Sequence, residues 1–398
     1  MSAKPRVLIA GAGLGGLAAA NALLAKGFDV EVYEQAPQLG EVGAGVQISP
    51  NGGHVMKALG LLEDLENVSS VQSGREIRLW DSGRTWKVAD TGPALIRLFG
   101  MMHYTVHRAD LHEIFVKGVE RRKTGAIHLN ARAAGFTQSR DGVILHLEDG
   151  RDVKGDVLIG ADGVHSCIRQ QMLGAGEPSF TGFIAWRGIA PAERLPEHLR
   201  RPVGTQWLAP GSHIYQYPLR RGALINMVGV VPRDDWRIES WSQRGTHEEC
   251  LRDYAGWHED AHALIRGLTA PFKWALMVRE PLQTWSQGRV SLLGDACHST
   301  LPFLAQGAVM SIEDGWVLAR ALEENRDVAI ALDRYQKARI ERTTRMVKTA
   351  AAQTERMHHE SFADPARAEK FVAEQWNEEQ FKSRYSWLYA YNAVTVPI

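Results

Sequence analysis

The sequence predicts an α/β fold into which an antiparallel, α+β type sheet is inserted and which ends in helices. Three patterns lead to this prediction. A strand, a glycine-rich turn, a helix and a second strand follow one another near the start of the chain. Two further buried strands, far apart in the sequence, each run into an Asp beside a Gly. Between them lie segments rich in β-branched and aromatic residues and separated by turn residues, which is typical of antiparallel strands.

The first pattern is a βαβ unit. Val7–Ala10 is an apolar run that predicts a buried strand. Gly16–Lys26 has the composition of a helix, with Gly27 just beyond its end. Val30–Glu34 alternates as a second strand. This order is typical of nucleotide-binding domains.

The turn of that unit reads Gly11-Ala12-Gly13-Leu14-Gly15-Gly16. Gly11 permits a tight turn, Gly13 lets backbone amides approach a pyrophosphate, and Gly16 allows close packing of the helix. Glu34, at the end of the second strand, can accept hydrogen bonds from ribose hydroxyls. These residues, together with Leu14 and Gln35, form a candidate dinucleotide site that does not by itself distinguish FAD from NAD.

Two later strands supply that distinction. Val157–Ala161 leads into Asp162-Gly163, and Val290–Leu293 leads into Gly294-Asp295. An acid such as Asp295 in that place could hold the polyol of a ribityl chain. FAD has a ribityl chain and a dinucleotide of the NAD type has none, so the pair of motifs favours FAD.

The inserted sheet is predicted from Phe183–Arg187, His213–Tyr217 and Leu224–Val231. Alternation along the middle strand places His213, Tyr215 and Tyr217 on one face. A histidine and two phenols suit a pocket for a phenol, because histidine titrates near neutral pH and can act as a base. The alternative is that this face only packs, with His213 hydrogen bonded in the core or exposed at its edge.

Composition excludes several classes of protein. The 46 basic and 46 acidic residues balance, so no electrostatic signature of nucleic-acid binding is present. No apolar run is long enough to cross a membrane. The three cysteines, Cys167, Cys250 and Cys297, suit neither a disulfide framework nor a zinc site, which favours a reducing, cytoplasmic compartment and a site without metal.

Three other groups of reactive side chains carry no predicted chemistry. Cys297-His298 are adjacent, so on extended chain they would point to opposite faces and not form a nucleophile–base pair. Glu313-Asp314 and His358-His359-Glu360 are interpreted as parts of solvated helix faces.

The three motifs occur in the order found in the class A flavoprotein aromatic hydroxylases, and the sequence resembles that family over nearly its whole length. Within it, the resemblance is to the salicylate hydroxylase-like and 3-hydroxybenzoate 6-hydroxylase-like branch. The segments in the style of this branch are Gly43–Asn51, His107–Leu111, Leu301–Ala308 and Trp387–Asn392. In the last of these the family usually carries Asp where Asn392 stands.

The resemblance implies a p-hydroxybenzoate-hydroxylase-like fold. A discontinuous FAD-binding domain would comprise residues 1–70, 100–175 and 276–350. A substrate-binding sheet domain would comprise residues 71–99 and 176–275. Residues 351–398 would form a C-terminal helical segment.

The resemblance also implies roles for individual residues. Arg108 would contact the ribityl or pyrophosphate part of FAD, Asp295 the ribityl hydroxyls, and Asp162 would shape its turn. Gly307 and Ala308 would open a helix whose positive end stabilises the reduced flavin. Val46 would complete the FAD site, His213 and Tyr217 would be catalytic, and the substrate pocket would include Tyr215, Gln47, Pro302 and Phe303.

The implied reaction uses NADH or NADPH as a transient co-substrate and O₂, and it hydroxylates a phenolic aromatic acid through a flavin C4a-hydroperoxide. Salicylate, converted to catechol, is the leading substrate because of Leu301-Pro302-Phe303. The alternatives are a 3-hydroxybenzoate 6-hydroxylase and a hydroxynicotinate monooxygenase. The first is less favoured because Pro302 stands where those enzymes usually have Gln. A redox sensor or oxidase that binds FAD without hydroxylating is the alternative of another class. Whether the protein forms a homodimer is a question that the sequence leaves open.

Overall fold

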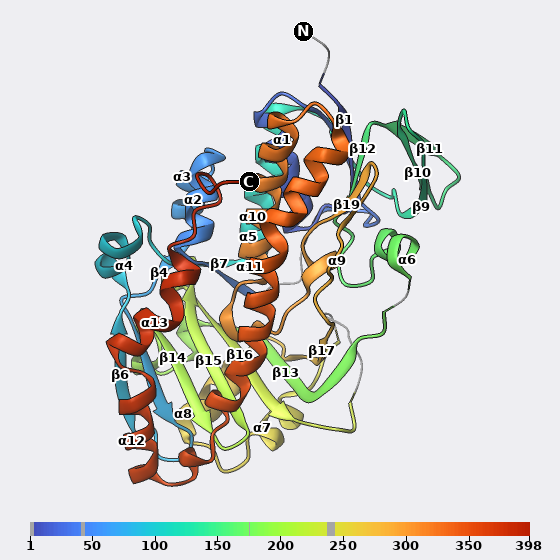
Figure 1. Ribbon diagram of the computed structural model, residues 1–398. Coiled ribbons are helices and arrows are strands. Elements are labelled where there is room, and N and C mark those ends of the chain that lie inside the picture. The colour runs from blue at the N-terminus through green and yellow to red at the C-terminus, as the bar shows by residue number, and fades with distance from the viewer. Residues whose placement is uncertain (1–3, 41–43, 175, 237–242) are drawn as a thin grey trace.

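The computed structural model describes residues 4–40, 44–174, 176–236 and 243–398. Gly43, the first residue of one of the family-like segments, lies outside these ranges. Two sheets dominate the architecture, one in the nucleotide-binding half and one in the inserted half, and a long C-terminal helix runs along both (Figure 1).

The first sheet has six strands in the order β18-β19-β12-β1-β2-β8 and is parallel except for its edge strand β18. The strands are β1 (Arg6–Ala10), β2 (Asp29–Tyr33), β8 (Ile127–His128), β12 (Val157–Gly160), β18 (Ser286–Gln287) and β19 (Val290–Leu292). Its central strands are apolar throughout because both faces of the sheet are covered. The predicted βαβ unit and the two later buried strands thus come together in one sheet.

Helices cover one face of this sheet and a small antiparallel sheet lies on the other side (Figure 1). The helices are α1 (Leu14–Ala25), α5 (Arg108–Arg122) and α10 (Gly307–Glu324), and the small sheet consists of β9 (Ala133–Gln138), β10 (Val143–Leu147) and β11 (Asp152–Gly155). Helices α1 and α10 pack closely at Gly315, where an added Cβ would lie 2.6 Å from the backbone nitrogen of Ala19.

The second sheet has seven strands in the order β17-β13-β16-β15-β14-β5-β6. They are β5 (Gly74–Leu79), β6 (Thr85–Asp90), β13 (Ser179–Pro191), β14 (Val203–Ala209), β15 (Ser212–Leu219), β16 (Leu224–Pro232) and β17 (Phe272–Val278). All neighbours are antiparallel except β5 and β14. One face packs on α7 (His247–Asp253) and α8 (Glu259–Gly267) around Trp186 and Trp207. On the other face, Ile77, Leu79 and Leu208 pack against the C-terminal segment 357–372.

The C-terminal part is helical, as the sequence predicts. Helix α11 (Val328–Met357) packs against α10, and α12 (Pro365–Gln375) and α13 (Glu378–Tyr389) return beside the seven-stranded sheet (Figure 1). The remaining elements are β3 (Gly45–Ile48), β4 (Ser70–Val71), β7 (Tyr104–His107), α2 (Pro50–Ala58), α3 (Leu62–Val68), α4 (Gly92–Phe99), α6 (Cys167–Leu173), α9 (Asp295–His298) and five short 3₁₀ turns, among them η4 (Pro302–Leu304). The α/β fold with an inserted antiparallel sheet is therefore confirmed, whereas the proposed domain boundaries stay a prediction.

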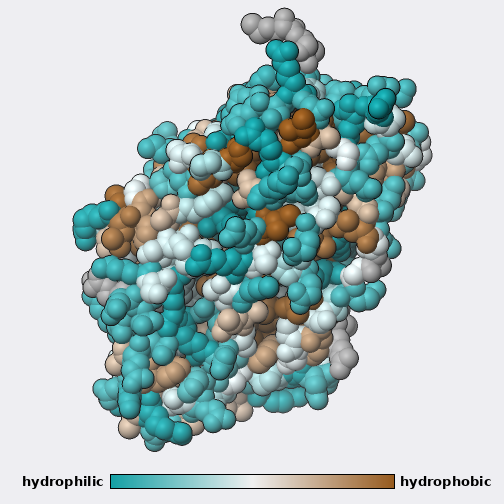
Figure 2. Space-filling model, viewed as in Figure 1, coloured by the Kyte–Doolittle hydropathy of each residue, from teal (hydrophilic) through white to brown (hydrophobic). Residues whose placement is uncertain are grey.

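The surface in Figure 2 is mostly hydrophilic, and its hydrophobic residues gather in separate patches. Over the described ranges, no helix combines the length and apolar character needed to cross a membrane.

Candidate cofactor and substrate sites

The predicted dinucleotide residues meet at the carboxyl edge of the six-stranded sheet. Parallel strands end at one edge, so the residues that follow β1, β12 and β19 become neighbours. A Cβ on Gly11 would lie 2.4 Å from the carbonyl oxygen of Ala161, and one on Gly16 would lie 2.1 Å from that of Gly11. A Cβ on Gly13 would meet nothing described within 4 Å. Gly11 and Gly16 are therefore required by the protein's own packing, while Gly13 borders open space that a pyrophosphate could approach.

Glu34 lies where an adenosine ribose would bind. Its carboxylate accepts hydrogen bonds from the backbone N–H groups of Ala12, at 2.7 Å, and Ala36, at 2.9 Å. A hollow of about 550 Å³ opens beside it, lined by Gln35, Asn130, Arg132, Glu148 and Asp149. Ala131 donates to the Glu34 carbonyl oxygen and so ties this hollow to the dinucleotide turn. The hollow therefore borders the predicted dinucleotide turn, and Asn130 and Arg132 are lining residues that sequence reasoning did not identify.

The two aspartates of the later motifs also lie at this edge. Asp162 accepts a hydrogen bond from the N–H of Ile168 at 3.2 Å, and its other carboxylate oxygen is buried without a described partner. Asp295 is exposed at the start of α9. Burial lowers the pKa of Arg108, and the Asp295 carboxylate acts against that shift, so these two charges lie near each other as the family pattern implies.

Helix α10 begins at Gly307, four residues earlier than Ser311, where the sequence pattern becomes amphipathic. Gln306 precedes it and provides no side-chain cap, so the N–H groups of the first turn, including those of Gly307 and Ala308, have no side chain satisfying them from the cap position. The N-terminus of an 18-residue helix carries a partial positive charge suited to an anionic ring. Val46 stands on β3, which pairs with β7 immediately before Arg108.

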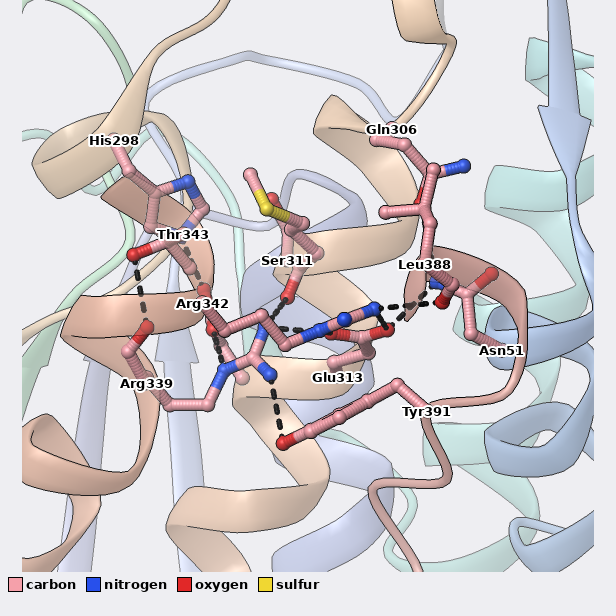
Figure 3. Close-up of polar contacts among 12 residues, drawn as sticks. Asn51, His298, Gln306, Ser311, Glu313, Arg339, Arg342, Thr343, Leu388 and Tyr391 are labelled. Atoms are coloured by element: carbon pink, nitrogen blue, oxygen red, sulfur yellow. Dashed lines mark hydrogen bonds and ion pairs between the residues drawn. The ribbon is translucent and has the colours of Figure 1, made fainter. Parts of the chain in front are cut away.

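A buried network of charges lies behind this helix terminus (Figure 3). Arg339 pairs with Glu313 and Asp314, each at 2.7 Å, and all three side chains are completely buried. Arg342 pairs with Glu313 at 2.8 Å, and His298 with Asp314 at 2.5 Å. The arginines lower the pKa of Glu313 against the opposing effect of burial, and His298 and Arg339 do the same for Asp314.

This network holds the loops of the cofactor site. Asp314 accepts a hydrogen bond from the N–H of Gly294, beside Asp295, at 3.2 Å. Glu313 accepts one from Asn51 at 2.7 Å, and Asn51 also donates to Gln306 at the start of α10. The interpretation of Glu313-Asp314 as a solvated helix face was therefore wrong. An amphipathic pattern describes one helix alone, so it does not show that an acidic residue is buried and paired with an arginine of another helix.

The substrate face of the second sheet presents the predicted aromatic residues. Tyr215 and Tyr217 lie with ring centroids 5.2 Å apart, and Gln47 lies within hydrogen-bonding reach of the Tyr217 hydroxyl. Gly45, on the same strand as Gln47, donates its N–H to Asn226 at 2.7 Å, and a Cβ there would lie 2.6 Å from the Tyr217 hydroxyl. Glycine at this position lets β3 of the cofactor half approach the substrate sheet.

His213 is buried on the same face and points toward the C-terminal part of the chain. Its Nδ1 lies 2.7 Å from Nε2 of His358, and Phe303 packs edge-on against its ring with centroids 5.5 Å apart. Burial, and then the neighbouring His358, hold the pKa of His213 well below its usual value. Burial lowers the pKa of His358 to about 4. The interpretation of His358 as part of a solvated face was therefore wrong, and nothing in the local sequence could have shown that it meets His213, 145 residues away.

Pro302 and Phe303 lie on the short turn η4 between α9 and α10. Pro302 is exposed, whereas Phe303 is half-buried and also packs near His358. Cys297, beside them in sequence, donates to the carbonyl oxygen of Gly294, and burial raises its pKa, so it is no nucleophile partner of His298. Within the described ranges, no three His, Cys, Asp or Glu side chains gather as metal ligands do.

A dinucleotide cradle facing an aromatic, histidine-bearing sheet is the arrangement of an FAD-dependent aromatic hydroxylase. The chain belongs to the FAD binding domain family, whose model matches residues 4–350. It is an FAD-dependent monooxygenase for which NAD(P)H serves as co-substrate.

The chain is similar to relatives of known activity. It is 34% identical to a 3-amino-4-hydroxybenzoate 2-monooxygenase of Streptomyces platensis over 99% of this chain and 98% of the relative. It is 35% identical to a 6-hydroxynicotinate 3-monooxygenase of Bordetella bronchiseptica, covering 88% and 91% of the two chains. It is 35% identical to a 3-hydroxybenzoate 6-hydroxylase of Polaromonas naphthalenivorans, covering 97% and 96%. A salicylate hydroxylase solved with its substrate matches with a TM-score of 0.81 and 26% identity over 99% of this chain and 97% of that chain.

Proposed function

We propose that this monooxygenase hydroxylates a phenolic aromatic carboxylic acid and that His213 is the base that takes the phenolic proton. The overall reaction consumes the aromatic acid, NAD(P)H, a proton and O₂ and yields the hydroxylated acid, NAD(P)⁺ and water. Where the new hydroxyl replaces the carboxylate, as in salicylate to catechol, a second proton is consumed and CO₂ is released. The observation that carries the proposal is His213, buried on the aromatic face, with its Nδ1 2.7 Å from Nε2 of His358.

FAD, when bound, supplies the redox chemistry that activates oxygen. Gly11, Gly13, Leu14, Gly16 and Glu34 would hold its pyrophosphate and ribose, and Gln35 its adenosine side. Arg108, Asp162 and Asp295 would position its ribityl chain. Val46, Gly307 and Ala308 would border its ring. The open space at Gly13 and the unpaired buried oxygen of Asp162 fit such a group.

The lowered pKa of His213 keeps its imidazole neutral at neutral pH, so that one ring nitrogen has a free lone pair, although burial also makes this imidazole a weaker base than an exposed histidine. When Nε2 takes the phenolic proton, Nδ1 also carries hydrogen and donates to Nε2 of His358. His358 thereby fixes the orientation of the His213 ring. Its own position is fixed by its carbonyl oxygen, which accepts from the N–H of Gly211 in the β14–β15 turn at 3.0 Å.

Tyr217 serves as a hydrogen-bond donor to the substrate. Burial, followed by the neighbouring Tyr215, raises its pKa, so the hydroxyl keeps its proton throughout the working range of pH. Tyr215 and Phe303 supply apolar surface for an aromatic ring, and Gln47 orients the Tyr217 hydroxyl. Pro302 is the least supported member of the predicted pocket because it is exposed.

The substrate candidates are salicylate, 3-hydroxybenzoate and 6-hydroxynicotinate. Relatives that are 34 or 35% identical carry the names of 3-amino-4-hydroxybenzoate, 6-hydroxynicotinate and 3-hydroxybenzoate enzymes, and the salicylate hydroxylase is 26% identical. This ranking favours a hydroxybenzoate or hydroxynicotinate over salicylate, the leading candidate from sequence.

The test is a substrate panel on the FAD-loaded protein. NADH or NADPH oxidation, O₂ consumption and aromatic product are followed together with each of the three acids. We expect one acid to stimulate NAD(P)H oxidation and to give hydroxylated product in proportion. Oxidation without aromatic product for every acid would contradict the proposal and support the non-hydroxylating alternative, an oxidase or redox sensor.

A further inference from the structure

Arg75 lies on the substrate face at the opposite end from His213. It stands on β5 and pairs in register with Gly204 of β14, and Thr205 next to it pairs with Gln216 of β15. Residues paired across neighbouring strands share a face. Arg75 therefore points to the same side of the sheet as Tyr215 and Tyr217.

Arg75 is a half-buried cation without a described anion. Its Nε is buried and has no partner in the described part of the chain, and its one hydrogen bond there is a long one, 3.5 Å to the Tyr389 hydroxyl. The rings of Phe381 and Tyr385, also on α13, lie 5.9 and 5.8 Å from its guanidinium carbon. No described Asp or Glu comes within ion-pair distance of Arg75.

Two other arginines of the molecule provide the contrast. Arg339 has two carboxylates, and Arg78, two residues after Arg75 on the same strand, pairs with Glu76 at 3.2 Å and Asp260 at 3.0 Å. Removing a cation from water without such a partner is unfavourable. A guanidinium left in that state is suited to an anion that arrives from outside, and its planar donors match a carboxylate.

The surroundings connect Arg75 to the substrate site. The ring of Tyr389 lies 6.1 Å from that of His103, whose Nε2 lies 2.9 Å from the Gln47 amide oxygen. Burial, followed by the charge of Arg75, holds the pKa of His103 well below its usual value, so this imidazole is neutral. Arg75 thus supplies a positive charge beside neutral polar groups and aromatic rings on this face of the sheet.

We propose that Arg75 binds the carboxylate of the aromatic substrate and that the hydroxyl at the other end of the ring faces His213. This proposal rests on the proposed function. Strand spacing and rise place the Cα atoms of Arg75 and His213 about 16 Å apart, a gap to be filled by two side chains and one substrate. A meta- or para-hydroxy acid presents its two polar groups toward both ends, whereas the neighbouring groups of salicylate point to one end. The anchor therefore selects 3-hydroxybenzoate or 6-hydroxynicotinate over salicylate.

The experiment measures equilibrium binding to the oxidised, FAD-loaded protein without NAD(P)H, so that no turnover occurs. The probes are 3-hydroxybenzoate and its neutral analogue 3-hydroxybenzamide, and the variants are Arg75→Met, Arg75→Lys and Arg84→Met. We expect Arg75→Met to raise the Kd of the acid about 10- to 100-fold, the scale of a charge-assisted hydrogen bond, and that of the amide less than about threefold. Arg75→Lys keeps the positive charge and should therefore raise the Kd of the acid less than Arg75→Met does.

Arg84→Met is the matched control because Arg84, on the turn after β5, is exposed and pairs with Glu369. Arg84→Met should leave the Kd of the acid and the Kd of the amide unchanged. If Arg75 only packs α13 onto the sheet, Arg75→Met will lower the melting temperature and weaken acid and amide equally, and that result overturns the proposal. Should Arg75→Met fail to fold, Arg75→Lys and Tyr389→Phe give the same acid-to-amide comparison.

The two proposals fail in different ways. If the wild-type protein hydroxylates a phenolic acid while Arg75→Met and Arg75→Lys keep the wild-type ratio of acid to amide affinity, only the carboxylate anchor is wrong. If the wild-type protein binds and hydroxylates none of the phenolic acids, the proposed function is wrong and the anchor with it.

Discussion

The cofactor half and the substrate half of this enzyme both bury polar groups, but they pair them differently. In the cofactor half, Glu313, Asp314, Arg339 and Arg342 satisfy one another and hold the loops around the site. Around the aromatic face of the second sheet, buried polar atoms of Arg75, His103, Asn226 and His358 have no described partner, whereas in the network's surroundings this is true only of Oδ1 of Asp162 and Nδ1 of His298. Because unpaired buried groups are costly, the first arrangement stabilises a fixed frame and the second leaves room for a ligand to complete it.

FAD-dependent monooxygenases share one cofactor, whereas the substrate differs from enzyme to enzyme. A paired network suits the constant ligand, since it positions Gly294 and Gln306 whether or not the site is filled. An unpaired face suits the variable ligand, since each orphaned donor or acceptor specifies one substrate group. The comparison can be tested by asking where a substitution damages the frame and where it damages only recognition.

The largest effect is expected within the dinucleotide turn. Gly13→Val should abolish FAD retention, because the side chain would occupy the space into which the pyrophosphate must come. The apoprotein should keep its melting temperature, since no described atom lies within 4 Å of the added Cβ. FAD content by absorbance and apoprotein melting are the two measurements.

Gly16→Val is the matched variant. Its Cβ would lie 2.1 Å from the Gly11 carbonyl oxygen, so it should lower apoprotein stability as well as FAD retention. A normal FAD content in Gly13→Val, or equal melting of the two apoproteins, would contradict the assignment of Gly13 to the cofactor.

Next in size is the buried ion network. Arg339→Met leaves Glu313 and Asp314 buried without their shared cation, and breaking such a cluster typically lowers the free energy of unfolding by about 3–5 kcal/mol. Lys337→Met, two residues earlier on α11 and exposed, should change it by less than about 0.5 kcal/mol. Urea unfolding measures both, and a small effect of Arg339→Met would show that the frame does not depend on these pairs.

His213→Ala tests the substrate half. It should keep FAD but lower hydroxylation about a hundredfold at neutral pH, the scale of a positioned base. The loss should shrink as the pH rises toward the pKa of the phenol, because the solution then supplies the phenolate. Single-turnover product formation from about pH 6 to 10 measures it.

His358→Phe is the companion variant, since it removes the acceptor of His213 but not the base. His358→Phe should lower hydroxylation less than His213→Ala does, and its loss should also shrink as the pH rises. If His213→Ala lowers FAD retention and stability while the residual activity keeps the wild-type pH profile, His213 is a packing residue and the proposed base is wrong.

Sequence could predict what depends on nearby residues. The glycine turn, the buried strands and the alternation that places His213, Tyr215 and Tyr217 on one face are local patterns, and the structure has all of them. It could not predict pairings between distant segments, such as Arg339 with Glu313 or His213 with His358. Each of these pairings depends on how α10 packs against α11 or how α11 packs against the sheet. The periodicity of a single segment does not specify this packing.

The last prediction concerns the pH dependence of stability, where the two halves should respond in different ranges. Burial lowers the pKa values of His103 and His213 well below normal and that of His358 to about 4. Below about pH 6.5 the unfolded chain binds protons that the folded chain does not, so stability should fall as the pH drops, by about 1.4 kcal/mol per pH unit for each such group. The lowered pKa values of Glu313 and Asp314 stabilise the fold above about pH 4.5, and that contribution is lost only below it.

Urea unfolding of the FAD-loaded protein between pH 7 and 5 should thus show a free energy of unfolding that falls with falling pH. The double variant His213→Asn/His358→Asn should reduce the slope of this dependence. Phe303→Leu, which touches both rings but does not titrate, should leave the slope unchanged. An unaltered slope in the double variant would mean that the substrate half is not the acid-sensitive part of the fold.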